Sequence, residues 1–168
     1  AGSITDEGAV VAIQPDGSFV FVANSSTALT ALAEGETFDA MLGYEVSDGQ
    51  GGTDIATATV TVTGVNDAPV AIDDAADVAE KGATVVNVLM NDADVDNGDT
   101  LTLSGLFQSD GTPLADLQFQ SNGEVTVTPG AGFFALGNDE TAAVVLTYEI
   151  SDALGATATG TVELTVLG

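Results

Sequence analysis

The chain has 168 residues and a formal net charge of −25, because it carries 26 Asp and Glu residues and one Lys or Arg. The electric field of this negative charge repels the phosphates of nucleic acids and anionic lipid headgroups. The composition therefore excludes nucleic-acid binding and docking on a membrane surface. Hydrophobic residues still make up 45% of the chain, too many for a disordered acidic tail. We therefore expect a folded protein whose natural partners are cations.

Two residue types that carry much metal and catalytic chemistry are missing. The sequence has no cysteine and no histidine, which excludes disulfides, thiol nucleophiles, His-based triads and the usual zinc sites. The remaining oxygen ligands suit calcium or magnesium. No apolar run approaches the roughly 20 residues of a membrane span, and Ala1 does not open a signal sequence. We expect a soluble fragment from a salty extracellular setting, with any targeting signal outside it.

Period-two alternation indicates an all-β chain. In 57–63 and 160–166, valine or leucine alternates with hydroxyl or acidic residues. Turn-forming sequences such as Pro15-Asp16-Gly17 and Asp110-Gly111 separate the strands, and 27–32 fits one turn of helix. The expected strands lie near 9–13, 18–23, 38–47 and 54–63, and then near 69–73, 84–90, 101–106, 114–120, 124–128, 143–150 and 157–167.

An internal repeat divides the chain. The sequence of 44–53 recurs in 148–157, an offset of 104 residues (148 − 44), and 19–21 matches 125–127 at an offset of 106. We therefore predict a complete seven-stranded, Ig-like β-sandwich over 67–168, preceded by the C-terminal part of another repeat over 1–66. The strands of 1–66 are too few to bury both faces of a two-sheet core. This part is either cut from a longer chain or completed by a neighbouring molecule.

Acidic residues concentrate where the two repeats meet. The segment 92–99 holds four aspartates in eight positions, which fits a loop for a hard cation better than a core strand. If the strands of the complete unit alternate in direction, this loop lies beside 66–67 and beside the turn at Asp152. One short loop rarely provides the roughly six to eight oxygens that calcium takes, so several segments must contribute. The predicted calcium ligands are Asn66, Asp67, Asp92, Asp94, Asp96 and Asp99, with Glu34 and Glu36 from the first unit.

The alternative is that these acidic residues form solvated turns. We expect Asp73 and Asp74, at the start of a strand, to be solvated, whereas Asp48 and Asp152 are turn residues that can also contribute to a cation site. The loop is not an EF-hand, because counting from Asp92 places no glycine at position six and no glutamate at position twelve.

Several stretches in order resemble the tandem cadherin-like or VCBS-type Ig-fold repeats of large bacterial surface adhesins, including RTX adhesins. The resemblance rests on 16–19, 44–53, 65–71, 73–74 and 88–96. It implies extender domains at the bacterial cell surface, strung end to end, rigidified by calcium at the linkers and serving adhesion or biofilm formation. The first repeat departs from the pattern because it is incomplete, and 152–155 lacks the glycine-rich form of 48–52.

Catalysis is not expected, because no nucleophile, phosphate-binding loop or oriented base is visible. The expected partners are neighbouring repeats of the same chain. Two alternatives remain: an adhesive domain that binds a ligand, and a fibre subunit assembled by strand complementation between copies. Phe133-Phe134 is the candidate contact pair of an adhesive domain, although we expect this pair to plug the end of the sandwich. We expect Lys81 at the surface. The aromatic residues expected in the core are Phe19, Phe21, Tyr44, Phe119 and Tyr148.

Overall fold

The structure is a computed structural model that describes residues 2–4, 8–108 and 114–168. The predicted Asp110–Gly111 turn lies outside the described residues. The chain divides into a first unit, Ala1–Asn66 with Val95–Gly98, and a second unit, Asp67–Asp94 with Asp99–Gly168. No helix among the described residues is long and apolar enough to span a membrane.

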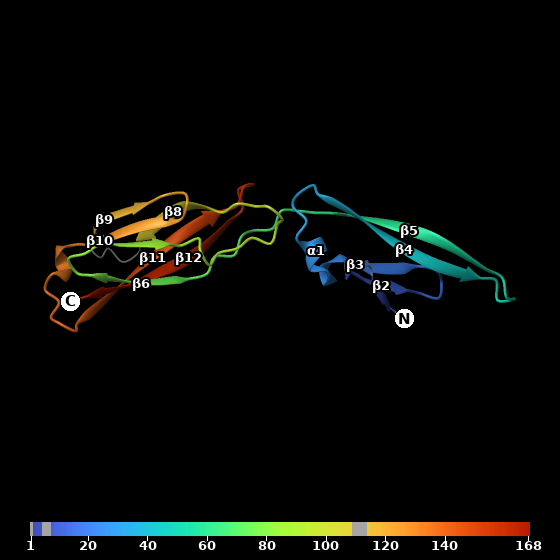
Figure 1. Cartoon of the computed structure of the whole chain (residues 1–168), viewed down its shortest axis with the longest axis horizontal. Helices are drawn as coiled ribbons and strands as arrows, with labels where there is room; N and C mark the ends of the chain where they lie inside the picture. Colours follow the sequence, from blue (N-terminus) through green and yellow to red (C-terminus); the bar gives the residue numbers. More distant parts are fainter. Residues whose placement is uncertain (1, 5–7, 109–113) are drawn as a thin grey trace. The chain divides into compact units, whose positions relative to one another are not determined.

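The second unit is a β-sandwich of two sheets (Figure 1). One sheet has the strand order β6-β12-β11-β8 and the other has the order β7-β10-β9. Strand β6 pairs with β12 in parallel, and the other neighbours are antiparallel. The predicted all-β, seven-stranded, Ig-like fold is therefore confirmed. The strands are β6 Asp74–Ala79, β7 Thr84–Asn87, β8 Thr102–Gln108, β9 Leu114–Phe119, β10 Glu124–Pro129, β11 Thr141–Ser151 and β12 Thr157–Leu167.

The first strand of this unit begins later than the sequence pattern predicts. We expected it near 69–73, but β6 begins at Asp74, and Val70 forms only an isolated bridge with Ala93. The physical reason lies in the acidic side chains. Asp92 Oδ1 accepts the Ile72 N–H at 2.7 Å, and Asp73 Oδ1 accepts the Thr161 N–H at 2.8 Å. Carboxylates thus bond to backbone donors that a regular strand ladder would otherwise use.

The core of the second unit lies between its two sheets. Alternate residues of β11 and β12 are fully buried, including Leu146, Tyr148 and Leu164, and they pack with Val125 of β10. Burying each such side chain contributes about 1.5–3 kcal/mol. Gly160 pairs with Tyr148 across β12 and β11, and a methyl group placed on Gly160 would overlap the Tyr148 ring.

We expect the substitution Gly160→Ala to destabilise the second unit by about 1–3 kcal/mol, because a close-packed core does not accept an added methyl group without strain. Hydrogen exchange of the β11 and β12 amides in urea measures the change. Gly43→Ala is the matched control, since Gly43 also lies in a strand but has open space around the added methyl group. Equal effects of the two substitutions would contradict this packing argument.

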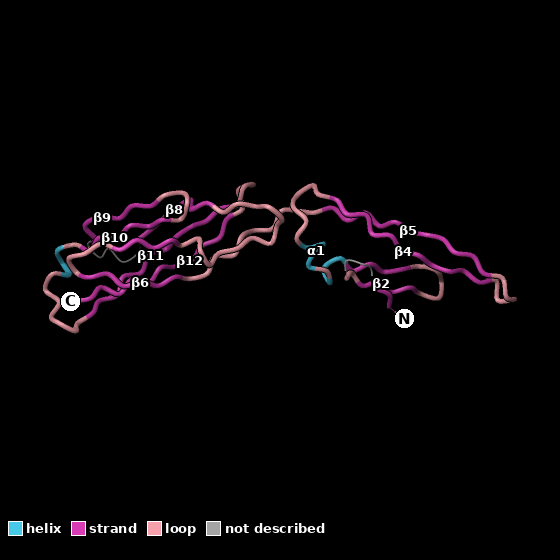
Figure 2. Tube along the Cα trace, in the orientation of Figure 1, coloured by secondary structure: helices cyan, strands magenta, loops and turns pink. Residues whose placement is uncertain are grey.

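The first unit contains two small sheets and a short helical connection (Figure 2). The sheets have the orders β1-β2-β3 and β4-β5. The connection is η1 Ala23–Ser25 followed by α1 Thr27–Thr30, and the Ser26 side chain caps α1 by accepting the Leu29 N–H at 3.4 Å. The strands are β1 Gly2–Ile4, β2 Val10–Ile13, β3 Phe19–Val22, β4 Thr37–Ser47 and β5 Thr53–Thr63. Sequence patterns predicted all of these except β1.

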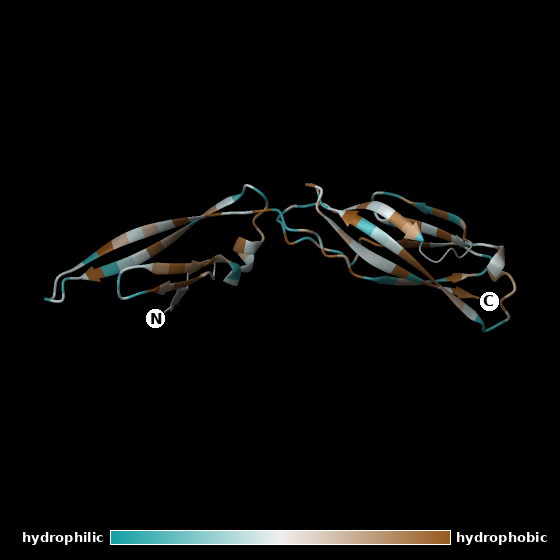
Figure 3. Ribbon diagram, turned by 180° about the vertical axis from the view of Figure 1, so that it is seen from behind, coloured by the Kyte–Doolittle hydropathy of each residue, from teal (hydrophilic) through white to brown (hydrophobic). Residues whose placement is uncertain are grey.

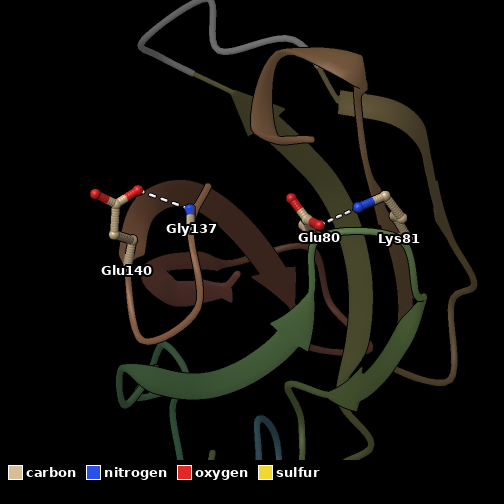
Figure 4. A network of polar contacts seen from close by, with 4 residues as sticks. All are labelled: Glu80, Lys81, Gly137 and Glu140. Carbon is tan, nitrogen blue, oxygen red and sulfur yellow. Dashed lines mark hydrogen bonds and ion pairs between the residues drawn. The ribbon is translucent and has the colours of Figure 1, made fainter. Parts of the chain in front are cut away.

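The internal repeat is also visible in the hydrogen bonds of the two long hairpins. At one end of each hairpin, the Asp48 N–H donates to Gly52 O and the Asp152 N–H donates to Ala156 O, both at 3.0 Å. At the other end, Glu36 Oε2 accepts the Ala33 N–H at 3.0 Å, and Glu140 Oε2 accepts the Gly137 N–H at 2.7 Å. Figure 4 shows the second of these contacts. Hairpins β4–β5 and β11–β12 are thus the same structure, displaced by 104 residues.

The prediction of five core aromatic residues is wrong for most of them. Tyr148 is fully buried, whereas Phe19, Tyr44 and Phe119 are 42%, 41% and 44% exposed. Phe119 lies on the edge strand β9, and the other two belong to the first unit, whose sheets have fewer strands. Phe21 is half-buried.

The Phe133–Phe134 pair divides between the core and the surface. Phe133 is 7% exposed and belongs to the core, whereas Phe134 is 46% exposed. The Lys81 Nζ atom lies 5.6 Å from the centre of the Phe134 ring, a cation–π distance. Lys81 is exposed and forms an ion pair with Glu80 (Figure 4), so its predicted surface position is confirmed.

Candidate metal centre

Carboxylates from two segments meet at one end of the second unit. One oxygen each from Asp94, Asp99 and Asp152 lies within 4.8 Å of the others. Asp94 and Asp99 follow β7, and Asp152 lies in the turn between β11 and β12. Charges of one sign at this spacing repel each other, so the cluster favours a bound cation. Carboxylate oxygens are the ligands that calcium and magnesium prefer.

The β11–β12 turn fixes Asp152. Its Oδ1 accepts the N–H groups of Leu154, Gly155 and Ala156 at 2.9, 2.5 and 2.8 Å. The residue is only 5% exposed. Gly155 has a φ of +93°, a left-handed backbone conformation that glycine adopts without strain. The turn therefore holds the carboxylate in place through its own backbone donors.

Asp99 connects the acidic loop to this turn. Its Oδ1 accepts the N–H of Thr100 at 2.6 Å and the N–H of Ala153 at 3.1 Å. The second bond joins two segments that are 54 residues apart. The hydrogen bonds of the protein itself therefore bring the Asp99 and Asp152 segments together, and a cation would bind to an arrangement that is largely formed in advance.

A second pair of carboxylates, Asp74 and Asp92, interacts with the Tyr148 side chain. Asp92 Oδ1 accepts the Ile72 N–H at 2.7 Å and lies 3.1 Å from the Tyr148 hydroxyl. Burial, followed by the charge of Asp92, raises the pKa of Asp74 to about 6. Burial and the same charge also raise the pKa of the Tyr148 hydroxyl.

One oxygen of each carboxylate in this pair lacks a donor. Asp74 Oδ2 and Asp92 Oδ2 are shielded from solvent and accept no hydrogen bond from any residue that the structure describes. Burying an acceptor without a partner costs about 1–3 kcal/mol, and more when the group is charged. A cation supplies the missing positive charge, so these orphaned oxygens fit a metal centre at this end of the unit.

The other predicted ligands are distributed over both units. Asn66 and Glu34 belong to the first unit and Asp67 to the second. Asp96 is 6% exposed and groups with the first unit through Val95–Gly98, where the Asn97 N–H donates to Ala31 O at 2.9 Å.

Glu36 has a structural role that the sequence did not predict. Its carboxylate accepts the Ala33 N–H, as the counterpart Glu140 does with Gly137. Its backbone carbonyl also accepts the Gly64 N–H at 2.8 Å. Because the same bonds recur one repeat later, they belong to the hairpin end.

Comparisons with known proteins decide the family. Residues 66–165 match the family model of the bacterial Ig domain. The chain belongs to this family. The resemblance predicted from the sequence is therefore confirmed, and the second unit is the bacterial Ig domain.

One similar protein is a calcium-binding lectin, RapA2, of Rhizobium johnstonii, which is 36% identical over 158 residues. The match covers 90% of this chain and 61% of that protein, so the chain spans about three-fifths of the length of its relative. Among solved structures, three domains (EC22-24) of mouse cadherin-23 match with a TM-score of 0.48 and 17% identity, over 94% of this chain and 48% of that one. Extracellular cadherin domains 1-5 of protocadherin gamma B2 match with a TM-score of 0.46 and 12% identity, over 95% and 30%.

Two acidic residues of the bacterial Ig domain are more deeply placed than the sequence suggested. Asp152 was expected mainly as a turn residue, but it is buried in the carboxylate cluster. Asp74 was expected to be solvated, but it is half-buried and its pKa is raised. For Asp152, the recurrence of Asp48 at position 152 was a sequence signal that this residue has a structural role. No comparable signal marked Asp74, because its burial depends on the pairing of β6 with β12.

Proposed function

We propose that this chain is a non-catalytic structural module of a bacterial surface adhesin, in which calcium stiffens tandem β-sandwiches outside the cell. The observation that carries the proposal is the cluster of Asp94, Asp99 and Asp152, with one oxygen of each within 4.8 Å of the others. The donorless oxygens of Asp74 and Asp92 support it, as does the name of the Rhizobium relative, a calcium-binding lectin. We retain Asn66, Asp67, Asp96, Glu34 and Glu36 as proposed ligands from the junction.

Calcium titration calorimetry of the whole chain tests the site. We expect Asp99→Asn to weaken calcium binding at least about tenfold, which corresponds to about 1.4 kcal/mol. The amide keeps an oxygen acceptor for the Thr100 and Ala153 N–H groups, so the substitution removes charge and leaves the loop geometry in place. Asp77→Asn on the exposed face of β6 is the matched control. Equal affinities of the two variants would rule out the cluster as the binding site.

Stiffening is a separate part of the proposal. Small-angle X-ray scattering of the chain with calcium and with EGTA measures it directly. We expect a broader distribution of maximum dimensions after chelation, because clustered carboxylates repel each other when no cation is bound. If calorimetry shows calcium binding but the two distributions are identical, the calcium site is retained and the extender role is excluded.

Carbohydrate binding is a second candidate function, favoured by the name of the Rhizobium relative as a lectin. It predicts an adhesive domain instead of a spacer. A glycan array probed with calcium and with EGTA separates the two: a spacer binds no glycan under either condition, whereas a calcium-dependent lectin binds in the first only.

A further inference from the structure

Large apolar side chains of the first unit are exposed where their counterparts in the second unit are buried. Tyr44 and Val46 on β4 are 41% and 53% exposed, and Phe19 on β3 is 42% exposed. The matching residues of the second unit are Tyr148, Ile150 and Val125, at offsets of 104, 104 and 106, and all three are 0% exposed. Figure 3 shows the hydrophobic stripes along β4 and β5.

Not every exposed apolar residue of the first unit differs from its counterpart in this way. Ile13 of the first unit corresponds to Phe119 at the offset of 106, and these residues are similarly exposed, at 49% and 44%. Phe19, Tyr44 and Val46 line a cavity of about 660 Å³ in the first unit, together with Ile13. Something that fills this space in the second unit is therefore missing from the described part of the first.

In the second unit, the segment from β6 to β8 fills the corresponding space. Val78, Val88 and Leu103 from this segment belong to the buried core. Its strands pair with three others: β6 with β12, β7 with β10 and β8 with β11. The counterparts of these three partners are β5, β3 and β4. Among the described residues, β5 and β4 pair only with each other and β3 pairs only with β2. The unpaired edges of β3, β4 and β5 in the first unit thus correspond to edges of β10, β11 and β12 that are paired in the second unit.

We propose that this surface of the first unit binds a three-strand segment of the β6–β8 type, supplied by polypeptide that precedes β2 in a longer chain. The segment would add a parallel strand to β5 and antiparallel strands to β4 and β3, and its alternate apolar residues would bury Tyr44, Val46 and Phe19. In the second unit the covering segment also precedes the counterpart of β2, so the connection has the same order. This inference does not depend on calcium.

A second copy of the chain is a poorer occupant. Its own β6–β8 segment is already packed in its second unit, where Val78, Val88 and Leu103 are at most 4% exposed. Donating that segment would uncover the core of the donor. Removing such residues from a core costs several kcal/mol, so donation from a separate, preceding segment is favoured.

The test is a chimaera of the full chain in which a duplicate of 67–108 replaces residues 1–7. We expect amide exchange in β3, β4 and β5 to slow at least about tenfold, and Tyr44 to lose its reactivity toward tetranitromethane. The matched control carries the duplicate with Val78→Asp and Leu103→Asp, which cannot enter an apolar core. Its β3–β5 amides should exchange as in the parent chain.

Two results would overturn the proposal. The first is unchanged exchange in β3–β5 of the chimaera. If the chimaera is insoluble, the 67–108 polypeptide added to the parent chain must give the same protection, and its failure counts equally. The second is a dimer of the parent chain in analytical ultracentrifugation that Val46→Asp dissociates, because the occupant would then be a second copy.

Discussion

Removing calcium with EGTA should lower the melting temperature of the second unit by about 10–20 °C. An extracellular calcium site with a Kd near 10⁻⁴ to 10⁻³ M, filled at about 100 times its Kd, stabilises the folded state by about 2.7 kcal/mol. For a domain of this size, each 1 kcal/mol shifts the melting temperature by about 4–8 °C. The reason is local: Asp94, Asp99 and Asp152 share a small volume, and without a cation their repulsion opposes folding. Differential scanning calorimetry measures the shift.

Ionic strength must be controlled in this experiment, because a net charge of −25 makes any salt stabilising through screening. The EGTA sample therefore receives potassium chloride to the same ionic strength, and excess calcium is added back to show reversal. Melting curves that superimpose with and without calcium would contradict the account.

The substitution Asp152→Asn should lower stability in the presence of calcium and should not lower it in the absence of calcium. The amide oxygen still accepts the N–H groups of Leu154, Gly155 and Ala156, so the turn persists. Without calcium, one fewer negative charge in the cluster leaves stability unchanged or slightly raised. With calcium, the lost ligand charge weakens binding, and we expect most of the roughly 2.7 kcal/mol of calcium stabilisation to be lost. Urea unfolding in calcium and in EGTA gives the four free energies that are needed.

Asp48→Asn is the matched control for this substitution. Asp48 occupies the same position in the first repeat, and its Oδ1 accepts the N–H groups of Gln50 and Gly52 at 2.7 and 2.9 Å. Both hydrogen bonds lower the pKa of Asp48, and the bond from the Gln50 N–H has the larger effect. Asp48 is not part of the Asp94–Asp99–Asp152 cluster, so its variant should show the same calcium stabilisation as the parent. If Asp152→Asn and Asp48→Asn respond alike, the Asp152 turn has no special role in binding.

The fold of the second unit could be predicted because the alternation of apolar and polar residues in its long strands shows which face of each strand is buried. Valine and leucine alternate with threonine and glutamate in β12, and the recurrence of 44–53 at 148–157 predicted the same hairpin in both repeats. The start of β6 could not be predicted, since it depends on bonds from Asp73 and Asp92 to backbone donors of distant segments. The exposure of Tyr44 also escaped prediction, because its sequence surroundings resemble those of the buried Tyr148.

The acidic loop and its position beside the Asp152 turn could be predicted from the sequence, but the hydrogen-bond partners of each aspartate in the loop could not. Asp99 meets the Asp152 turn through the Ala153 N–H, a contact that follows from the sheet topology. Asp92 lies beside the Tyr148 hydroxyl instead of in the Asp94–Asp99–Asp152 cluster. The spacing of aspartates along a loop predicts which side chains are available to bind a cation. The burial and hydrogen bonds of those side chains depend on the surrounding strands.

A crystal structure of the chain grown with calcium tests the central claim most directly. The account predicts an ion with carboxylate oxygens of Asp94, Asp99 and Asp152 at about 2.3–2.6 Å, identified by its anomalous signal. Waters alone between these three carboxylates, in crystals that contain calcium well above the Kd measured by calorimetry, would contradict it.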